Sequence, residues 1–175
     1  MITVAIIGTR KPDVGQREYA ELLAHRLSLN YEVTIATGGA VGIDEAAMRG
    51  ALISRLVVYL PWASYNNYLL PRYATCVVAG DAETHPDWFA SVENYHPNPR
   101  ALSRGMRALH ARNFGIVSNS RLVLAFPSDD GGGGTGQGIR IAHGEGIPVM
   151  QFNRGEQLPA FETLLGDIVD TISGF

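Results

Sequence analysis

Cysteine is nearly absent from the sequence, and several features that would define a class of protein are missing altogether. The 175 residues contain one cysteine, Cys76, which excludes an internal disulfide framework and any zinc site built from several cysteines. Its apolar neighbours Val77 and Val78 favour a buried thiol. No uninterrupted apolar run reaches the roughly 18 residues of a membrane helix, and the N-terminus lacks the basic segment and cleavage site of a signal peptide. These absences predict a cytoplasmic protein with no membrane partner.

Lysine is also scarce, and basic residues are not in excess. Of the 14 basic residues only Lys11 is lysine, and the formal net charge is −3. This balance argues against a general nucleic-acid-coating surface, which usually needs an excess of Lys and Arg. Arginine holds phosphates and carboxylates through two parallel hydrogen bonds, but a GC-rich coding bias also replaces Lys with Arg. The five histidines show no metal-ligand spacing, so no metal site is expected.

Apolar residues make up 46% of the chain, which is enough to bury a core, and they occur in an alternating pattern. Strands are predicted at 2–7, 33–36, 56–60, 122–126 and from 148, and helices at 14–29, 42–53, 100–118, 134–143 and 161–172. Such alternation predicts an α/β fold. We expect a single Rossmann-like domain over residues 1–175, with an open, mostly parallel sheet flanked by helices. Residues 62–110 blur the pattern and are interpreted as an irregular insertion with one short strand near 75–79.

Glycine-rich segments follow directly after predicted strands. The first strand ends in Gly8, Thr9 and Arg10, the second runs into a turn over 37–44, and the strand at 122–126 is followed by a glycine run over 131–134. Ligands of such sheets bind beyond the carboxyl ends of the strands. A glycine-rich turn that enters a helix offers free N–H groups to a phosphate. The sequence therefore predicts a nucleotide or phosphate–ribose site, although it has neither a Walker loop nor a standard dinucleotide fingerprint.

The sequence resembles the SLOG superfamily of Rossmann-like domains over about residues 1–60 and 110–150. This superfamily includes the DNA-processing protein A family and the Lonely Guy phosphoribohydrolases. The motifs that carry the resemblance are Gly8-Thr9-Arg10, the turn from Thr37 to Ala47, Leu60-Pro61 with Tyr65-Asn66, Arg112-Asn113, the stretch from Ser120 to Pro127, and Gly133-Gly134-Thr135.

The resemblance implies a phosphate held on the backbone N–H groups of residues 132–135, with residues 38–42 as the opposite wall and two arginines neutralising charge. The candidate ligand-binding residues are Gly8, Thr9, Arg10, Gly38, Gly39, Gly42, Asp44, Arg112, Asn113, Gly132, Gly133, Gly134 and Thr135. Lonely Guy enzymes carry a catalytic Glu at the position of Gly138, so catalytic residues stay unidentified here and the chain's status as an enzyme stays open.

Three functions remain at this point. The first is binding of a nucleotide or nucleotide-derived ligand, with N-glycosidic bond cleavage as the reaction if the chain is an enzyme. The second is a single-stranded DNA-binding module, and the third is a non-catalytic sensor or sequestering protein for a nucleotide signal. A homo-oligomer is expected. No cofactor is required, and Mg²⁺ alongside a phosphate ligand at Asp129-Asp130 is the alternative.

Several further residues have two interpretations. Asp44 either holds a ribose hydroxyl or caps its helix. Arg100, Arg104 and Arg107 would share one face of a helix, as a solvated stripe, an oligomer contact or a track for phosphates. The aromatic residues upstream either stack on a base or pack in a core or subunit contact; they are Trp62, Tyr65, Tyr68 and Tyr73.

Overall fold

The structure, a computed structural model, describes residues 1–174; Phe175, the last residue of the expected domain, lies outside the described residues. Six strands form one sheet in which every neighbouring pair is parallel, in the order β4-β3-β2-β1-β5-β6. The strands are β1 (Thr3–Gly8), β2 (Thr34–Thr37), β3 (Leu56–Leu60), β4 (Thr75–Val78), β5 (Leu122–Phe126) and β6 (Val149–Gln151). The helices are α1 (Val14–Asn30), α2 (Ile43–Gly50), α3 (Pro86–Tyr95), α4 (Arg104–Ser118), α5 (Gly133–Gly144) and α6 (Phe161–Ser173).

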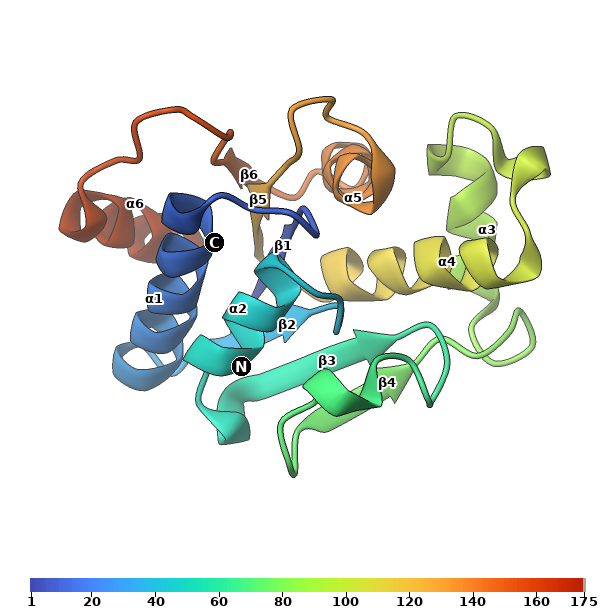
Figure 1. Ribbon diagram of the computed structural model, residues 1–175, viewed down its shortest axis with the longest axis horizontal. Helices are drawn as coiled ribbons and strands as arrows, with labels where there is room; N and C mark the ends of the chain where they lie inside the picture. The colour runs from blue at the N-terminus through green and yellow to red at the C-terminus, as the bar shows by residue number, and fades with distance from the viewer. Residues whose placement is uncertain (175) are drawn as a thin grey trace.

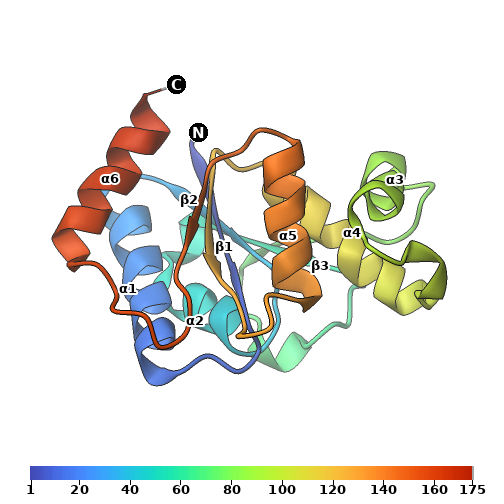
Figure 2. The ribbon, with the colours of Figure 1, turned by 90° about the horizontal axis from the view of Figure 1, so that it is seen from above.

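The two central strands are buried on both faces, as their continuous apolar sequences predict. β1 pairs with β5 in the register Ala5 to Val123 and Ile7 to Ala125. One face of the sheet packs against α1, α2 and α6, and the opposite face packs against α4 and α5, with α3 outside them (Figure 2). The expected α/β architecture is therefore confirmed, and the sheet is parallel throughout the described residues.

Local sequence signals explain where α1 begins and how closely α2 packs on it. Asp13 caps α1 by accepting a hydrogen bond from the backbone N–H of Gln16, and the Gln16 side chain accepts from the Asp13 N–H in return. α2 crosses α1 at Gly50, where a Cβ atom would collide with the backbone carbonyl of Glu21. Gly50 thus allows a closer approach of the two helices than any larger residue would.

The segment between β3 and α4 is more ordered than the sequence pattern predicts. The expected short strand near 75–79 is confirmed as β4. Helix α3 is missing from the sequence prediction, because the proline at 86 is also typical of irregular chain. Pro86 is in fact the first residue of the helix, a position where its fixed φ is favourable and its missing N–H costs nothing.

Two further expectations from this part of the chain are wrong. The helix expected from residue 100 begins at Arg104, capped by Ser103, and Arg100 lies in a separate short turn, so Arg100 does not share a face with Arg104 and Arg107. Cys76 is exposed rather than buried, because β4 is the edge strand of the sheet and its first two residues face solvent. Apolar sequence neighbours cannot distinguish an edge strand from a central one.

None of the helices among residues 1–174 combines the length and the apolar character that crossing a bilayer would require.

Candidate functional site

A pocket of about 410 Å³ opens at the carboxyl ends of β1 and β5. These strands lie side by side, and the connection after β1 leads to β2 on one side while the connection after β5 leads to β6 on the other. The chain order reverses between them, which is where ligands of open α/β sheets bind. The pocket is lined by Ile7, Gly8, Thr9, Arg10, Lys11, Ala40, Asp44, Met106, His110, Arg112, Asn113, Ile116, Ser128, Gly132, Gly133, Gly134 and Thr135.

The first turn of α5 forms one wall of the pocket. Gly132 precedes the helix without a side-chain cap, and the first intrahelical hydrogen bond in this turn runs from the Gly136 N–H to the Gly132 carbonyl. The N–H groups of residues 133–135 come before that bond, so helical geometry leaves them without an intrahelical acceptor. Together with the positive end of the helix dipole, they make this wall suitable for an anion.

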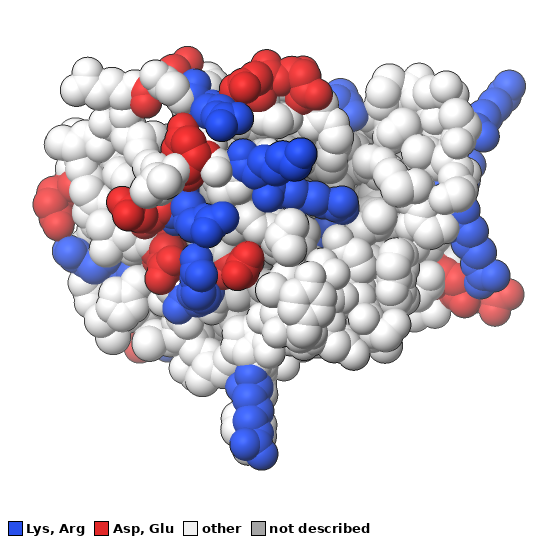
Figure 3. All heavy atoms as spheres, viewed as in Figure 1, with Lys and Arg blue, Asp and Glu red and all other residues white. Residues whose placement is uncertain are grey.

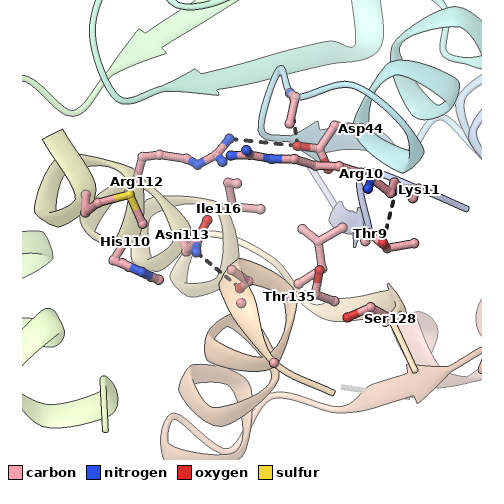
Figure 4. A pocket seen from close by; sticks show the side chains of 17 residues that line it. Thr9, Arg10, Lys11, Asp44, His110, Arg112, Asn113, Ile116, Ser128 and Thr135 are labelled. Carbon is pink, nitrogen blue, oxygen red and sulfur yellow. Dashed lines mark hydrogen bonds and ion pairs between the residues drawn. The ribbon is translucent and has the colours of Figure 1, made fainter. Parts of the chain in front are cut away.

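Basic side chains stand beside this wall. Arg10 and Lys11 follow β1, line the pocket and are exposed. Figure 3 shows basic side chains gathered at the middle of the face seen in Figure 1, with acidic side chains above them and to their left. Arg10 extends across the pocket toward Arg112 (Figure 4), and its Nη2 lies 3.5 Å from the Tyr65 hydroxyl. Two guanidinium groups that approach each other favour an anion nearby, since an anion offsets their repulsion.

Arg112 lines the pocket but is also part of a buried network. Its Nη1 donates to the carbonyl oxygens of Gly38 and Tyr59 and lies 3.8 Å from Oδ2 of Asp44. Burial lowers the pKa of the Arg112 guanidinium, and the neighbouring Asp44 opposes that shift. Arg112 therefore forms an ion pair with the carboxylate of Asp44, a structural role that does not require a phosphate ligand.

Asp44 is tied to the same network. Its Oδ2 accepts the Ala40 N–H at 3.2 Å (Figure 4), and α2 has no side-chain hydrogen bond at its cap. Burial raises the pKa of the Asp44 carboxyl, and Arg112 opposes this shift. Asp44 thus does not cap α2, and its carboxylate holds the turn over 37–44 against α4.

The second glycine-rich turn contributes less of the pocket wall than expected. Ala40 and Asp44 line the pocket, whereas Gly38, Gly39 and Gly42 do not. Gly38 packs against the Arg112 guanidinium, and Gly39 and Gly42 have φ of 69° and 89°. These three glycines shape the turn behind the pocket. The remaining candidates come together at the pocket itself: Gly8, Thr9, Arg10, Asp44, Arg112, Asn113, Gly132, Gly133, Gly134 and Thr135.

Sequence reasoning did not find several lining residues, among them Lys11, Met106 and His110. His110 is buried and shares a hydrogen bond with Oε1 of Gln137, which also accepts from Nδ2 of Asn113 at 3.0 Å. Only the helical position of His110, three residues before Asn113 and so on the same face of α4, could have suggested a place near the site. This polar cluster joins α4 to α5 directly beneath the pocket.

His110 should make stability depend on pH. Burial lowers its pKa below the ordinary value of 6.5, and the bond to Gln137 opposes this in part. Below about pH 6.5 the unfolded chain therefore binds a proton at this residue more readily than the folded chain, so stability falls on acidification by up to about 1.4 kcal/mol per pH unit. Denaturant titrations of the wild type and His110→Asn between pH 7.5 and 5.5 should show a shallower loss in the variant. Parallel losses would contradict this assignment.

Gly138 occupies a position that does not face the pocket. A Cβ atom there would lie 2.6 Å from Cδ1 of Ile7 and 3.9 Å from Cγ2 of Val117. Gly138 therefore lets α5 lie close against β1, and a side chain at this position would displace the tip of the Ile7 side chain. The only carboxylate among the described lining residues is Asp44.

The two acidic residues after β5 have other contacts. Asp130 accepts from the Ser128 hydroxyl at 2.6 Å and from the Gly132 N–H at 3.1 Å, and Asp129 lies 3.6 Å from Nη1 of Arg154. Among residues 1–174, no group of three or more His, Cys, Asp or Glu side chains is arranged to hold a metal ion. Both carboxylates are thus engaged in contacts within the protein.

The fold and the position of the pocket define a Rossmann-like α/β domain, and part of the chain is similar to a family related to the SLOG superfamily that the sequence resembles. Residues 1–77 match the family described as DNA recombination-mediator protein A. None of the curated proteins compared with the sequence matches it.

Similar solved structures cover nearly the whole chain. DNA processing protein A from Helicobacter pylori, described by its single-stranded DNA binding mode, is 18% identical with a TM-score of 0.68 over 98% of this chain and 81% of that one. The molybdenum cofactor binding protein from Rippkaea orientalis is 19% identical with a TM-score of 0.59 over 99% and 85%. DNA processing protein A from Streptococcus pneumoniae is 18% identical with a TM-score of 0.56 over 97% and 56%. At these identities the similarities establish the fold.

Proposed function

We propose that the pocket binds a nucleotide or nucleotide-derived ligand through its phosphate. The observation that carries this proposal is the meeting of the open first turn of α5 with Arg10 and Lys11 across one pocket. Backbone N–H groups hold phosphate oxygens without regard to the rest of the ligand. The two basic side chains supply the charge, and Arg10 adds a planar pair of donors.

The dimensions of the pocket support a small ligand. Its volume of about 410 Å³ lies within the 300–1,000 Å³ typical of small-molecule sites. The wall also contains apolar side chains, Ile7, Ile116 and Met106, which suit the less polar part of a nucleotide.

Binding without cleavage is the form of this function that the site favours. General acid–base cleavage of an N-glycosidic bond needs a side chain free to exchange a proton with the ligand, and His110, which lines the pocket, is hydrogen-bonded to Gln137. Asp44 is paired with Arg112, and Gly138 faces the sheet. We therefore propose a carrier or sensor for a nucleotide rather than a phosphoribohydrolase.

Single-stranded DNA is the second candidate ligand. The match of residues 1–77 to the DNA recombination-mediator family favours it, because these residues include Arg10 and Lys11. A DNA ligand would bring several phosphates, so its affinity should fall steeply with salt, whereas a mononucleotide would lose less. Titration of an oligonucleotide and of adenosine monophosphate at two salt concentrations distinguishes these ligands.

Replacing Arg10 with alanine tests the proposed function. Hydrogen bonds to charged groups are worth roughly 1.5–3 kcal/mol each, so Arg10→Ala should weaken binding of adenosine monophosphate by at least ~10-fold. The melting temperature should stay unchanged, because Arg10 is exposed. Calorimetric titration measures the affinity, and mass spectrometry of the ligand before and after incubation should find it intact.

Arg55→Ala is the matched control for charge. Arg55 precedes β3 at the amino end of the sheet and forms an exposed ion pair with Glu32, far along the strand from the pocket edge. The Arg55→Ala variant should bind adenosine monophosphate with wild-type affinity. If Arg10→Ala also binds with wild-type affinity, Arg10 is not part of the site. Release of free adenine would contradict binding without cleavage.

A further inference from the structure

An aromatic pair lies at the mouth of the pocket. The Trp62 and Tyr65 rings meet edge to face, with centroids 5.3 Å apart and planes at 86°. Tyr65 contacts both pocket arginines: its hydroxyl lies 3.5 Å from Nη2 of Arg10, and its ring centroid lies 5.9 Å from Cζ of Arg112. The pair is therefore continuous with the basic wall of the pocket.

Trp62 also packs against helix α4. A Cβ atom at Gly105 would lie 3.8 Å from Cζ3 of Trp62, so the indole packs against the first turn of α4. The next residue of that turn, Met106, lines the pocket and is 43% exposed. The indole consequently lies between Tyr65 and the first turn of α4, the turn that brings Met106 to the pocket.

The two tryptophans of the chain are used differently. Trp88 stacks on His85 with centroids 3.9 Å apart and packs against Gly115, inside the contact between α3 and α4. Trp62 remains 40% exposed. An edge-to-face partner covers at most one face of an indole, so Tyr65 leaves part of the indole surface exposed.

The segment that carries Trp62 is held in place before any ligand binds. The Tyr65 N–H donates to the Trp62 carbonyl at 3.1 Å, which closes a turn. Nδ2 of Asn66 donates to the Gly39 carbonyl at 3.2 Å, and this bond ties the turn to the glycine-rich segment after β2. A side chain on such an anchored turn loses little further freedom when it contacts a ligand.

We infer that Trp62 is the stacking surface for a nucleobase whose phosphate lies at the first turn of α5, so that the ligand is recognised at both ends. This inference rests on the proposed function of the pocket and adds the class of ligand: a phosphate joined to a flat heteroaromatic ring, as in a free nucleotide or in one nucleotide of a single strand. Stacking on an aromatic side chain accepts any base. Met106 supplies a polarisable neighbour to the ring edge.

Two ligands that differ only in the base test the inference. Wild type, Trp62→Ala and Trp62→Phe are titrated with adenosine monophosphate and with ribose 5-phosphate. Trp62→Ala should weaken binding of the nucleotide about tenfold and leave ribose 5-phosphate unchanged, and Trp62→Phe should recover part of the loss. Tyr68→Ala is the control, since Tyr68 is an aromatic residue of the same segment and is 79% exposed. Adenosine monophosphate should also quench tryptophan fluorescence in the wild type and not in Trp62→Phe.

The possible outcomes distinguish the stacking role of Trp62 from the proposed binding of a phosphate in the pocket. If Trp62→Ala binds both ligands as the wild type does, the stacking role is overturned while the phosphate pocket stands. If the wild type binds neither ligand, both proposals fall together. A ten-residue oligodeoxyadenylate added as a third ligand identifies the source of the base: tighter binding that also depends on Trp62 indicates single-stranded DNA, and weaker binding indicates a free nucleotide.

Discussion

Replacing Arg112 with alanine is expected to lower the free energy of unfolding by about 3–5 kcal/mol, because it leaves a buried carboxylate without its partner. Arg112 and Asp44 are 7% and 6% exposed, and Nη1 of Arg112 also satisfies the carbonyl oxygens of Gly38 and Tyr59. Removing the guanidinium therefore takes a buried partner from three acceptors at once. For a chain of this size, the melting temperature should fall by roughly 2–4 °C for each kcal/mol lost.

A second arginine of the same helix is the control. Arg107 pairs with Glu93 at 2.6 Å, but both side chains are partly exposed, so Arg107→Ala should cost less than about 1 kcal/mol. Asp44→Asn combined with Arg112→Ala should cost less than the sum of the two single changes, since the partners form one unit. If Arg112→Ala keeps wild-type stability and loses nucleotide affinity, the guanidinium acts on the ligand and not on the fold. Arg112→Lys should recover part of either loss, because lysine keeps the charge without the planar pair of donors.

Gly42→Ala should have the second large effect, a loss of about 3 kcal/mol together with weaker ligand binding. Gly42 has a φ of 89°, and a Cβ atom there would lie 2.5 Å from the Thr9 carbonyl oxygen and 2.8 Å from Cα of Arg10. Backbone strain of about 1–2 kcal/mol therefore adds to an overpacking cost of about 1–3 kcal/mol. The Ile43 N–H also donates to the Thr9 carbonyl, so movement here displaces Arg10 from the pocket. Denaturant unfolding measures the first effect, and nucleotide titration of the folded protein measures the second.

Gly146→Ala separates strain from crowding. Gly146 has a φ of 69°, a Cβ atom there would have no neighbour within 4 Å, and the residue does not line the pocket. The substitution should cost only the strain, about 1 kcal/mol. Equal losses at both glycines would show that positive φ alone, and not the approach of the β1 loop, requires glycine at position 42.

The order of strands and helices could be predicted from sequence because burial leaves a direct trace in it. β1 and β5 are apolar at successive positions, since helices cover both faces of the sheet there. The edge strand β4 carries the same kind of sequence, so the sequence alone wrongly predicts that its exposed Cys76 is buried. α3 escapes prediction because proline marks both irregular chain and the first residue of a helix.

Much of the pocket could be anticipated for a related reason. Glycine-rich turns that enter helices are local in sequence, and parallel strands bring their carboxyl ends to one edge. The pairing of Arg112 with Asp44 is not local, because the two residues lie on different helices far apart in the chain. No sequence pattern around either residue indicates its partner. His110 lacks a motif for the same reason: its partner Gln137 comes from α5, and only packing of the two helices brings them together.

The residues that line the pocket floor and the aromatic pair beside it come from separate stretches of chain. The floor comes from the loops after β1 and β5, whereas Trp62 and Tyr65 belong to the excursion after β3. An insertion, a deletion or an aromatic substitution in that excursion does not alter the sequence of the loops after β1 and β5. Under the proposed function, substitutions in this excursion would change contacts with the base and leave the proposed phosphate contacts in place.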